Sequence, residues 1–183
     1  MSKSLGNILN PLDMIQKYGA DATRLSLIMG AAPGNDVKLS EDRIRGYKNF
    51  ANKIWNISRF VLEQNGATEV TLTPEDERLV AEAEEAVHTA TKHINAFRLD
   101  LAGDALYQFI WTRFADQILE ESKPMLKGES ASARSSRAHA LYQSLVIILK
   151  ALHPFMPFVT EAIWKELPHK NTDVLMVAPW PVQ

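Results

Sequence analysis

The chain of 183 residues contains no cysteine. This absence excludes disulfides and metal sites built from thiolates, and it is compatible with a reducing compartment. No apolar run approaches the roughly 20 residues that a membrane-spanning helix needs. The first residues also lack the apolar core of a signal peptide. We therefore expect a cytoplasmic protein that does not enter a membrane.

A large excess of charge is also lacking, because 20 basic and 22 acidic residues leave a net charge of −2. A general attraction to nucleic acid is therefore excluded, and a polyanionic partner must be held by a local basic patch. His88 and His93 are five residues apart and do not share a helix face, so we expect no metal site. Hydrophobic residues make up 46% of the chain, which is enough for a sizeable core.

The hydrophobic periodicity is helical throughout, without the strand–helix alternation of a doubly wound sheet. We expect helices over 11–17, 21–29, 41–64, 74–94, 99–122, 138–152 and 158–167, and a short extended segment over 174–177. Ser40 and Thr73 are candidate N-caps, whereas Pro124 should end a helix. Long helices with short connections predict an all-α antiparallel bundle. The turn-rich segment 31–36 suggests two domains, 1–35 and 36–183.

The first seven residues contain a lysine between two serines, followed by Gly6. The ammonium group of Lys3 and the hydroxyls of Ser2 and Ser4 are suited to phosphate oxygens. Composition alone favours the alternative, an incidental lysine in an irregular N-terminal segment. These three residues are nevertheless candidates for a phosphate contact.

The segment 41–64 predicts a helix whose polar face carries amides, cations and one aromatic ring. Amides can pair with base edges, cations can hold phosphates, and a ring can stack on an unstacked base. The candidate RNA contacts are Arg43, Arg45, Lys48, Asn49, Asn52, Lys53, Asn56, Arg59 and Phe60. Two alternatives stay open, since Phe60 could pack against a neighbouring helix and each cation could simply be solvated. Lys127 and Arg134, in a predicted loop over 127–136, and the adjacent Arg137 form a weaker second patch. The acidic stretch 74–88 should be a solvated face.

Several motifs resemble the class I aminoacyl-tRNA synthetases. Met1-Ser2-Lys3-Ser4-Leu5-Gly6-Asn7 is similar to the second signature loop of that family, without its leading lysine. Gly19-Ala20-Asp21-Ala22-Thr23-Arg24 resembles the helix that follows in the branched-aliphatic subgroup. Further segments of the chain resemble the valine-specific members of that subgroup. These segments are 35–37, 47–56, 97–102, 106–107, 121–124, 153–161 and 178–181.

The resemblance implies the C-terminal part of a valine-specific enzyme, with an anticodon-binding bundle that holds the anticodon arm of tRNA. In that family the middle lysine of the loop stabilises the phosphates of ATP, a substrate accompanied by Mg²⁺, and the matching position is Lys3. The resemblance thus makes Lys3 the candidate catalytic group, and it makes Ser2, Lys3 and Ser4 the candidate ATP-binding residues. The nucleotide-binding sheet domain is absent from this chain, so we expect the chain alone to be inactive. We also expect it to be a monomer and to hold no cofactor. Its partners would be tRNA and the remaining catalytic domain. The isoleucine or leucine enzymes, or a helical interaction module without an RNA function, are the alternatives.

Overall fold

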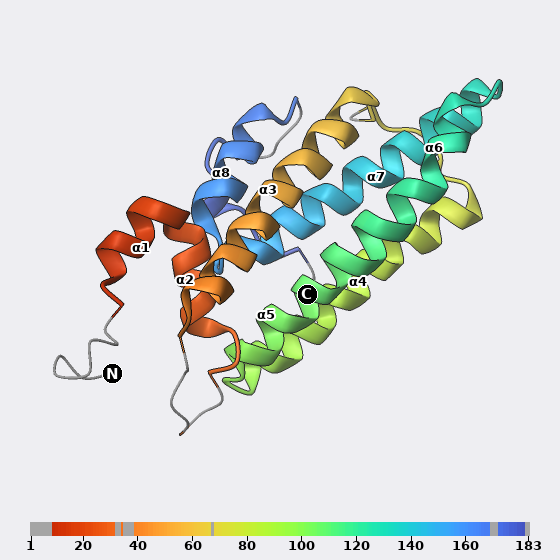
Figure 1. Ribbon diagram of the computed structural model, residues 1–183. Helices are drawn as coiled ribbons and strands as arrows, with labels where there is room; N and C mark the ends of the chain where they lie inside the picture. The colour runs from red at the N-terminus through yellow and green to blue at the C-terminus, as the bar shows by residue number, and fades with distance from the viewer. Residues whose placement is uncertain (1–8, 32–33, 35–38, 67, 169–171, 182–183) are drawn as a thin grey trace, which may run out of the picture.

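The computed structural model describes residues 9–31, 34, 39–66, 68–168 and 172–181. Within these ranges the chain forms helices and turns without any β-strand, so the predicted all-α class is confirmed (Figure 1). The elements are α1 Pro11–Tyr18, α2 Ala20–Ile28, α3 Glu41–Glu63, α4 Pro74–Asn95, α5 Leu99–Gln108, η2 Phe109–Ile118, α6 Leu119–Lys127, α7 Ala131–Leu152, α8 Pro157–Glu166 and η3 Leu175–Val177. None of the helices in the described ranges is both long and apolar enough to cross a membrane.

The predicted helix starts follow from local capping. The Ser40 hydroxyl accepts a hydrogen bond from the backbone N–H of Arg43, which satisfies one of the free donors at the start of α3. The Thr73 hydroxyl does the same for the N–H of Asp76 at the start of α4. Gly19 ends α1 with φ of +92°, a conformation that glycine adopts without a steric penalty.

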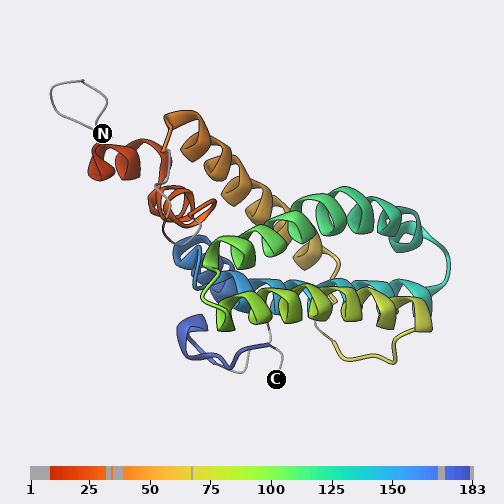
Figure 2. The ribbon, with the colours of Figure 1, turned by 90° about the horizontal axis from the view of Figure 1, so that it is seen from below.

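The helix predicted over 99–122 is longer than expected and is not α-helical throughout. α5, η2 and α6 are continuous, and η2 is a π-helical stretch of 10 residues in the middle of a bowed rod (Figure 2). The predicted end at Pro124 is wrong, because Pro124 lies inside α6. α6 packs along α7, and Leu126 contacts the main core, so tertiary packing offsets the loss of the proline N–H.

The predicted loop over 127–136 is confirmed only for the connection at 128–130 and is wrong from Ala131 on, since Ser130 caps α7 and the helix begins there. Arg137 on this helix is only 3% exposed and pairs with the fully buried Asp76 of α4. Neither a solvated acidic face at Asp76 nor a basic patch at Arg137 therefore exists. The segment predicted as extended over 174–177 contains the short 3₁₀ helix η3.

The core lies between α3, α4, α7 and the α5–η2–α6 rod (Figures 1 and 2). Its largest buried side chains include Phe50, Phe114 and Trp164. α1 and α2 pack against the N-terminal half of α3, and Leu25 and Met29 belong to the main core. The proposed domain boundary at residue 35 falls among residues outside the described ranges, and the division into two domains stays a prediction.

Candidate nucleic-acid interface

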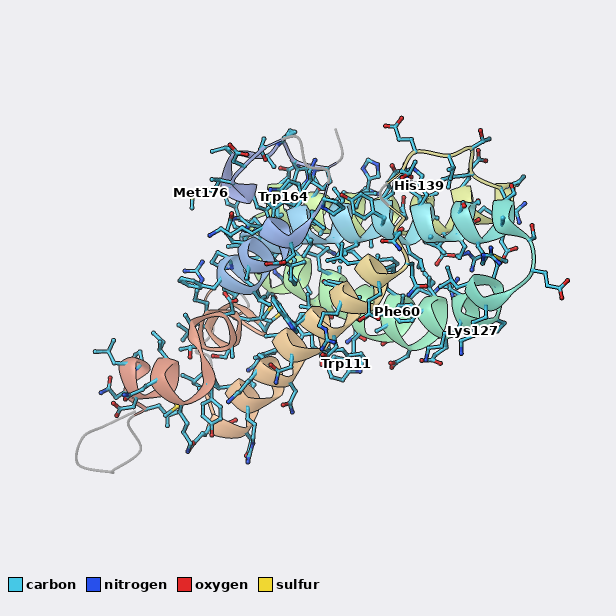
Figure 3. The ribbon with its side chains drawn as sticks, turned by 90° about the horizontal axis from the view of Figure 1, so that it is seen from above. Phe60, Trp111, Lys127, His139, Trp164 and Met176 are labelled. Atoms are coloured by element: carbon cyan, nitrogen blue, oxygen red, sulfur yellow. The ribbon has the colours of Figure 1, made fainter. Side chains whose placement is uncertain are left out.

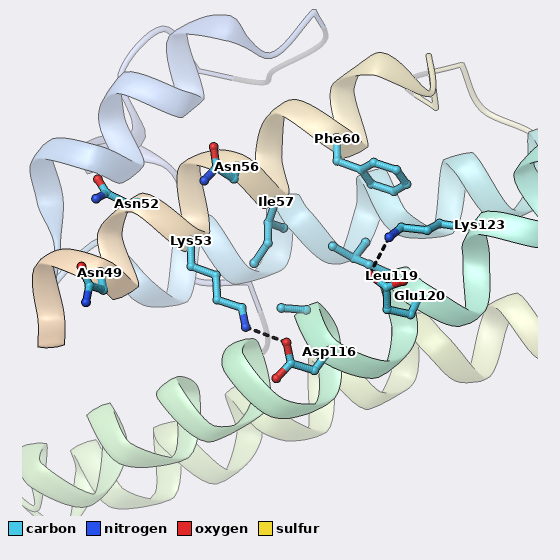
Figure 4. Close-up of a pocket in the computed structure, with 11 residues that line it drawn as sticks. Asn49, Asn52, Lys53, Asn56, Ile57, Phe60, Asp116, Leu119, Glu120 and Lys123 are labelled. Carbon is cyan, nitrogen blue, oxygen red and sulfur yellow. Dashed lines mark hydrogen bonds and ion pairs between the residues drawn. The ribbon is translucent and has the colours of Figure 1, made fainter.

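A groove of about 510 Å³ runs between the polar face of α3 and the η2–α6 part of the long rod (Figure 4). Five of the predicted RNA contacts line its α3 wall: Asn49, Asn52, Lys53, Asn56 and Phe60. Ile57, Ala115 and Leu119 are buried and form an apolar floor. The groove therefore combines an apolar floor with a rim of polar groups, as ligand sites commonly do.

The three asparagines occupy positions i, i+3 and i+7 of α3 and hence share one face. All three are exposed, and none has a side-chain hydrogen-bond partner among the described residues. Asparagine in a helix costs up to about 0.7 kcal/mol relative to alanine. Within the described part of the chain, no side-chain hydrogen bond of Asn49, Asn52 or Asn56 offsets this cost, so their amides are available to an external partner.

Lys53 lies in the groove, but its ammonium group already has partners. Its Nζ is 2.6 Å from Oδ1 of Asp116 and 4.0 Å from the centroid of the Trp111 ring. Trp111 in turn stacks on Tyr107 at 5.7 Å, within an aromatic cluster that also contains Phe50. Lys53 is thus held by an ion pair and a cation–π contact, both of which cross from α3 to η2.

Phe60 lies one turn beyond Asn56 and points from α3 toward the α6 wall (Figure 4). It is half-buried and packs against the main core, while the rest of its ring faces the groove. Figure 3 shows Phe60 and Trp111 along the same seam between α3 and the long rod. The ring therefore packs against the bundle, as one of the two sequence interpretations expected, whereas stacking on a base stays a prediction.

The opposite wall carries Asp116, Glu120 and Lys123. Lys123 Nζ is 2.6 Å from Oε1 of Glu120, one helical turn away. The sequence analysis did not identify these three residues as site candidates. They lie more than fifty positions from α3, and only the packing of the bundle places them across the groove from it.

Arg43 and Lys48 lie away from the groove and face α1 and α2. The Arg43 guanidinium donates to the backbone carbonyl of Met29 at the end of α2, and its Nε is 3.5 Å from the Tyr47 hydroxyl. Lys48 Nζ donates to the Lys17 carbonyl at 3.3 Å. These two cations therefore join the N-terminal helices to α3, and a role in RNA contact stays a prediction for both.

Arg45 and Arg59 are exposed near the two ends of α3, outside the groove lining. Arg45 pairs with Asp42, three residues earlier, and Arg59 lies 3.9 Å from Glu63, four residues later. Exposed pairs of this kind contribute only about 0–1 kcal/mol. A phosphate could therefore replace either carboxylate at low cost, although RNA contact by these two arginines also stays a prediction.

The candidate ATP-binding residues Ser2, Lys3 and Ser4 lie outside the described residues. Their proposed roles therefore stay predictions from the sequence.

Two protein families match this chain. Residues 76–183, more than half of the chain, match the family described as the anticodon-binding domain of tRNA ligase. Residues 1–40 match the family described as tRNA synthetases class I (I, L, M and V). α3, which carries the asparagines, lies between the two matched ranges.

Similar curated proteins include three bacterial valine–tRNA ligases. The chain is 41% identical to that of Carboxydothermus hydrogenoformans over 187 residues, covering 99% of this chain and 21% of the relative. Identity is 43% over 189 residues for Enterococcus faecalis, covering 100% and 21%. It is 42% over 193 residues for Pelagibacter ubique, covering 99% and 22%. The chain thus spans about a fifth of the length of these relatives.

Solved structures that share the fold include two synthetases. The ternary complex of Agrobacterium radiobacter K84 LeuRS, tRNA and LeuAMS has a TM-score of 0.75 at 18% identity, covering 100% of this chain and 22% of the other. The apo form of Mycobacterium tuberculosis methionyl-tRNA synthetase has a TM-score of 0.71 at 20% identity, covering 89% and 35%.

Proposed function

Because this chain belongs to the family of anticodon-binding domains of tRNA ligases, we propose that it binds the anticodon arm of a valine tRNA. The resemblance to class I synthetases is confirmed by the two family matches. A valine-specific parent enzyme is supported over a leucine-specific one, because the chain is 41–43% identical to valine–tRNA ligases and 18% identical to the LeuRS structure. The groove on α3 is the proposed contact surface.

The observation that carries this proposal is the row of three asparagines, without side-chain partners among the described residues, beside a half-buried ring. Bases in an anticodon loop are unpaired, so their edges are open to amide donors and acceptors and their faces are open to stacking. Phe60 would stack on one base, which is worth roughly 1–3 kcal/mol. Arg45 and Arg59, near the ends of the same helix, would contact the RNA backbone.

For the whole enzyme, we propose activation of valine with ATP and transfer to tRNA. The names of the relatives support this activity, and the chain spans only about a fifth of their length. Lys3 would hold ATP phosphates within the remaining catalytic domain, with Mg²⁺ accompanying ATP and with Ser2 and Ser4 nearby. The chain alone should form no aminoacyl-adenylate, because positioning of ATP and amino acid needs the missing sheet domain. A cytoplasmic location and a monomeric state are likewise proposed.

The test is a titration of this chain with an anticodon stem-loop RNA that carries a valine anticodon. A second RNA has the same stem and backbone but replaced anticodon bases, and stem-loops with isoleucine and leucine anticodons serve as further competitors. We expect tighter binding of the valine stem-loop and weaker binding as salt rises. Equal affinity for all four RNAs would refute the proposal.

A pair of variants locates the contact. Phe60→Ala should weaken binding of the valine stem-loop about 5- to 150-fold, the equivalent of roughly 1–3 kcal/mol. Phe158→Ala is the matched control, since Phe158 is 63% exposed on α8 and does not line the groove. It should leave RNA binding unchanged. If both variants bind the RNA like the unmodified chain, the ring of Phe60 only packs against the bundle.

A further inference from the structure

Asp116 forms an ion pair with Lys53 across the groove, from the wall opposite α3. It lies in the π-helical stretch η2, and its side chain is 55% exposed, whereas that of Lys53 is 24% exposed. Trp111, one turn earlier on η2, makes a cation–π contact with the same ammonium group. π-helical stretches are rare in proteins, and those that occur are often found at functional sites. Here one such stretch supplies both partners of Lys53.

The second lysine of the groove, Lys123, has its own carboxylate in Glu120 (Figure 4). The two lysines and two carboxylates in the lining therefore cancel in formal charge. The remaining polar groups of the lining are the neutral amides of α3. A phosphate that approaches the groove meets Asp116 and Glu120, whereas a neutral base meets amides, an apolar floor and Phe60.

We propose that Asp116 is a specificity-determining residue. Its carboxylate balances the positive charge of Lys53 by ion pairing, so that the groove favours bases over phosphates. This inference rests on the proposed binding of an anticodon arm. Without Asp116, Lys53 would offer an unpaired cation to any RNA backbone. With Asp116 present, the groove adds to the binding affinity of an RNA chiefly when a base fits into it.

The size of the effect follows from counterion release. Each phosphate neutralised on single-stranded nucleic acid contributes about −0.7 to the slope of log K against log salt. One freed lysine should therefore steepen the slope for non-cognate RNA by about 0.7, which is about a five-fold gain in affinity at 0.1 M salt. The cognate loop should gain less, because its base fills the groove and keeps phosphates away from Lys53.

The experiment measures binding of Asp116→Asn to the valine stem-loop and to the RNA with replaced anticodon bases, from about 0.05 to 0.3 M salt. We expect about five-fold tighter binding of the non-cognate RNA, less than about two-fold change for the cognate RNA, and hence several-fold lower discrimination. Asp116→Ser, which removes the charge with a different side chain, should behave alike. Circular dichroism of each variant checks that the bundle is folded.

Two controls separate this role from a general change of charge. Glu84→Gln on the exposed face of α4 also removes one negative charge, outside the groove lining, and should leave discrimination unchanged. The double variant Lys53→Met with Asp116→Asn should lose the non-cognate gain, because the freed cation is gone. If the unmodified chain discriminates and Asp116→Asn discriminates equally well, the inference is overturned while the proposed function stands. If the unmodified chain does not discriminate, both fail.

Discussion

Arg137 and Asp76 form a buried ion pair that should be among the most sensitive points of the fold. The side chains are 4% and 0% exposed, and the pair joins α7 to α4. Arg137 also donates to the Ser122 hydroxyl at 3.1 Å and to Glu75 at 2.8 Å, so its guanidinium connects three helices. Asp76 accepts further hydrogen bonds from the hydroxyls of Thr73 and Ser136.

Replacing Arg137 by methionine preserves much of the side-chain volume but leaves the carboxylate of Asp76 buried without its cation. Breaking a buried pair in this way typically costs about 3–5 kcal/mol. The entropy of unfolding for 183 residues is about 0.4 kcal/mol/K at about 2.1 cal/mol/K per residue. The melting temperature should therefore fall by about 8–13 °C. Thermal unfolding followed by circular dichroism measures this fall directly.

The double replacement of Arg137 by methionine and Asp76 by leucine tests the physical reason. Removing both charges also removes the uncompensated carboxylate, and such exchanges are often neutral or stabilising. We therefore expect the double variant to melt well above the Arg137→Met variant. A loss below about 1 kcal/mol for Arg137→Met, or a double variant that is less stable than the single one, would refute the reasoning.

Two further predictions concern the loop after α3 and the turn before α8. A Cβ on Gly66 would lie 2.0 Å from the carbonyl oxygen of Ala138, so Gly66→Ala should lower the free energy of unfolding by about 1–3 kcal/mol or more. Gly46→Ala is the control, since a Cβ there meets no atom within 4 Å, and urea unfolding of both variants checks the difference. Burial lowers the pKa of His153 from 6.5 against the opposing effect of Glu161 and Asp21, so the unfolded chain takes up a proton first as pH falls. Stability should accordingly fall as pH drops below about 6.5, and His153→Gln should lose part of this dependence in unfolding titrations between about pH 5 and 7; an unchanged pH profile would contradict it.

The α3 wall of the candidate site could be predicted because helical spacing alone assigns residues to faces. Asn49, Asn52 and Asn56 share a stripe in any α-helix, and Ser40 and Gln64 delimit that helix by local signals. The opposite wall could not be predicted in this way. Asp116 and Lys123 reach the groove only through the packing of η2 and α6 against α3, and no periodic pattern in the sequence indicates the π-helical stretch.

Lys53 shows the limit of assigning roles from residue type. As a lysine on a polar helix face, it is a reasonable candidate for a phosphate contact. The structure instead places its ammonium group between a carboxylate and an indole ring, at 2.6 Å and 4.0 Å. Because these partners come from a different helix, only the tertiary arrangement changes what the charge can do.

The sequence alone was sufficient for the all-α class, most helix boundaries, the polar stripe on α3 and the family. These depend on local capping, helical periodicity and ordered motifs, all of which act within short stretches of chain. Tertiary structure alone decided which charged groups remain available. It buried Arg137 against Asp76, kept α6 helical through Pro124 and set Asp116 against Lys53. Such pairings depend on distances between helices far apart in the chain, which packing determines and local sequence does not.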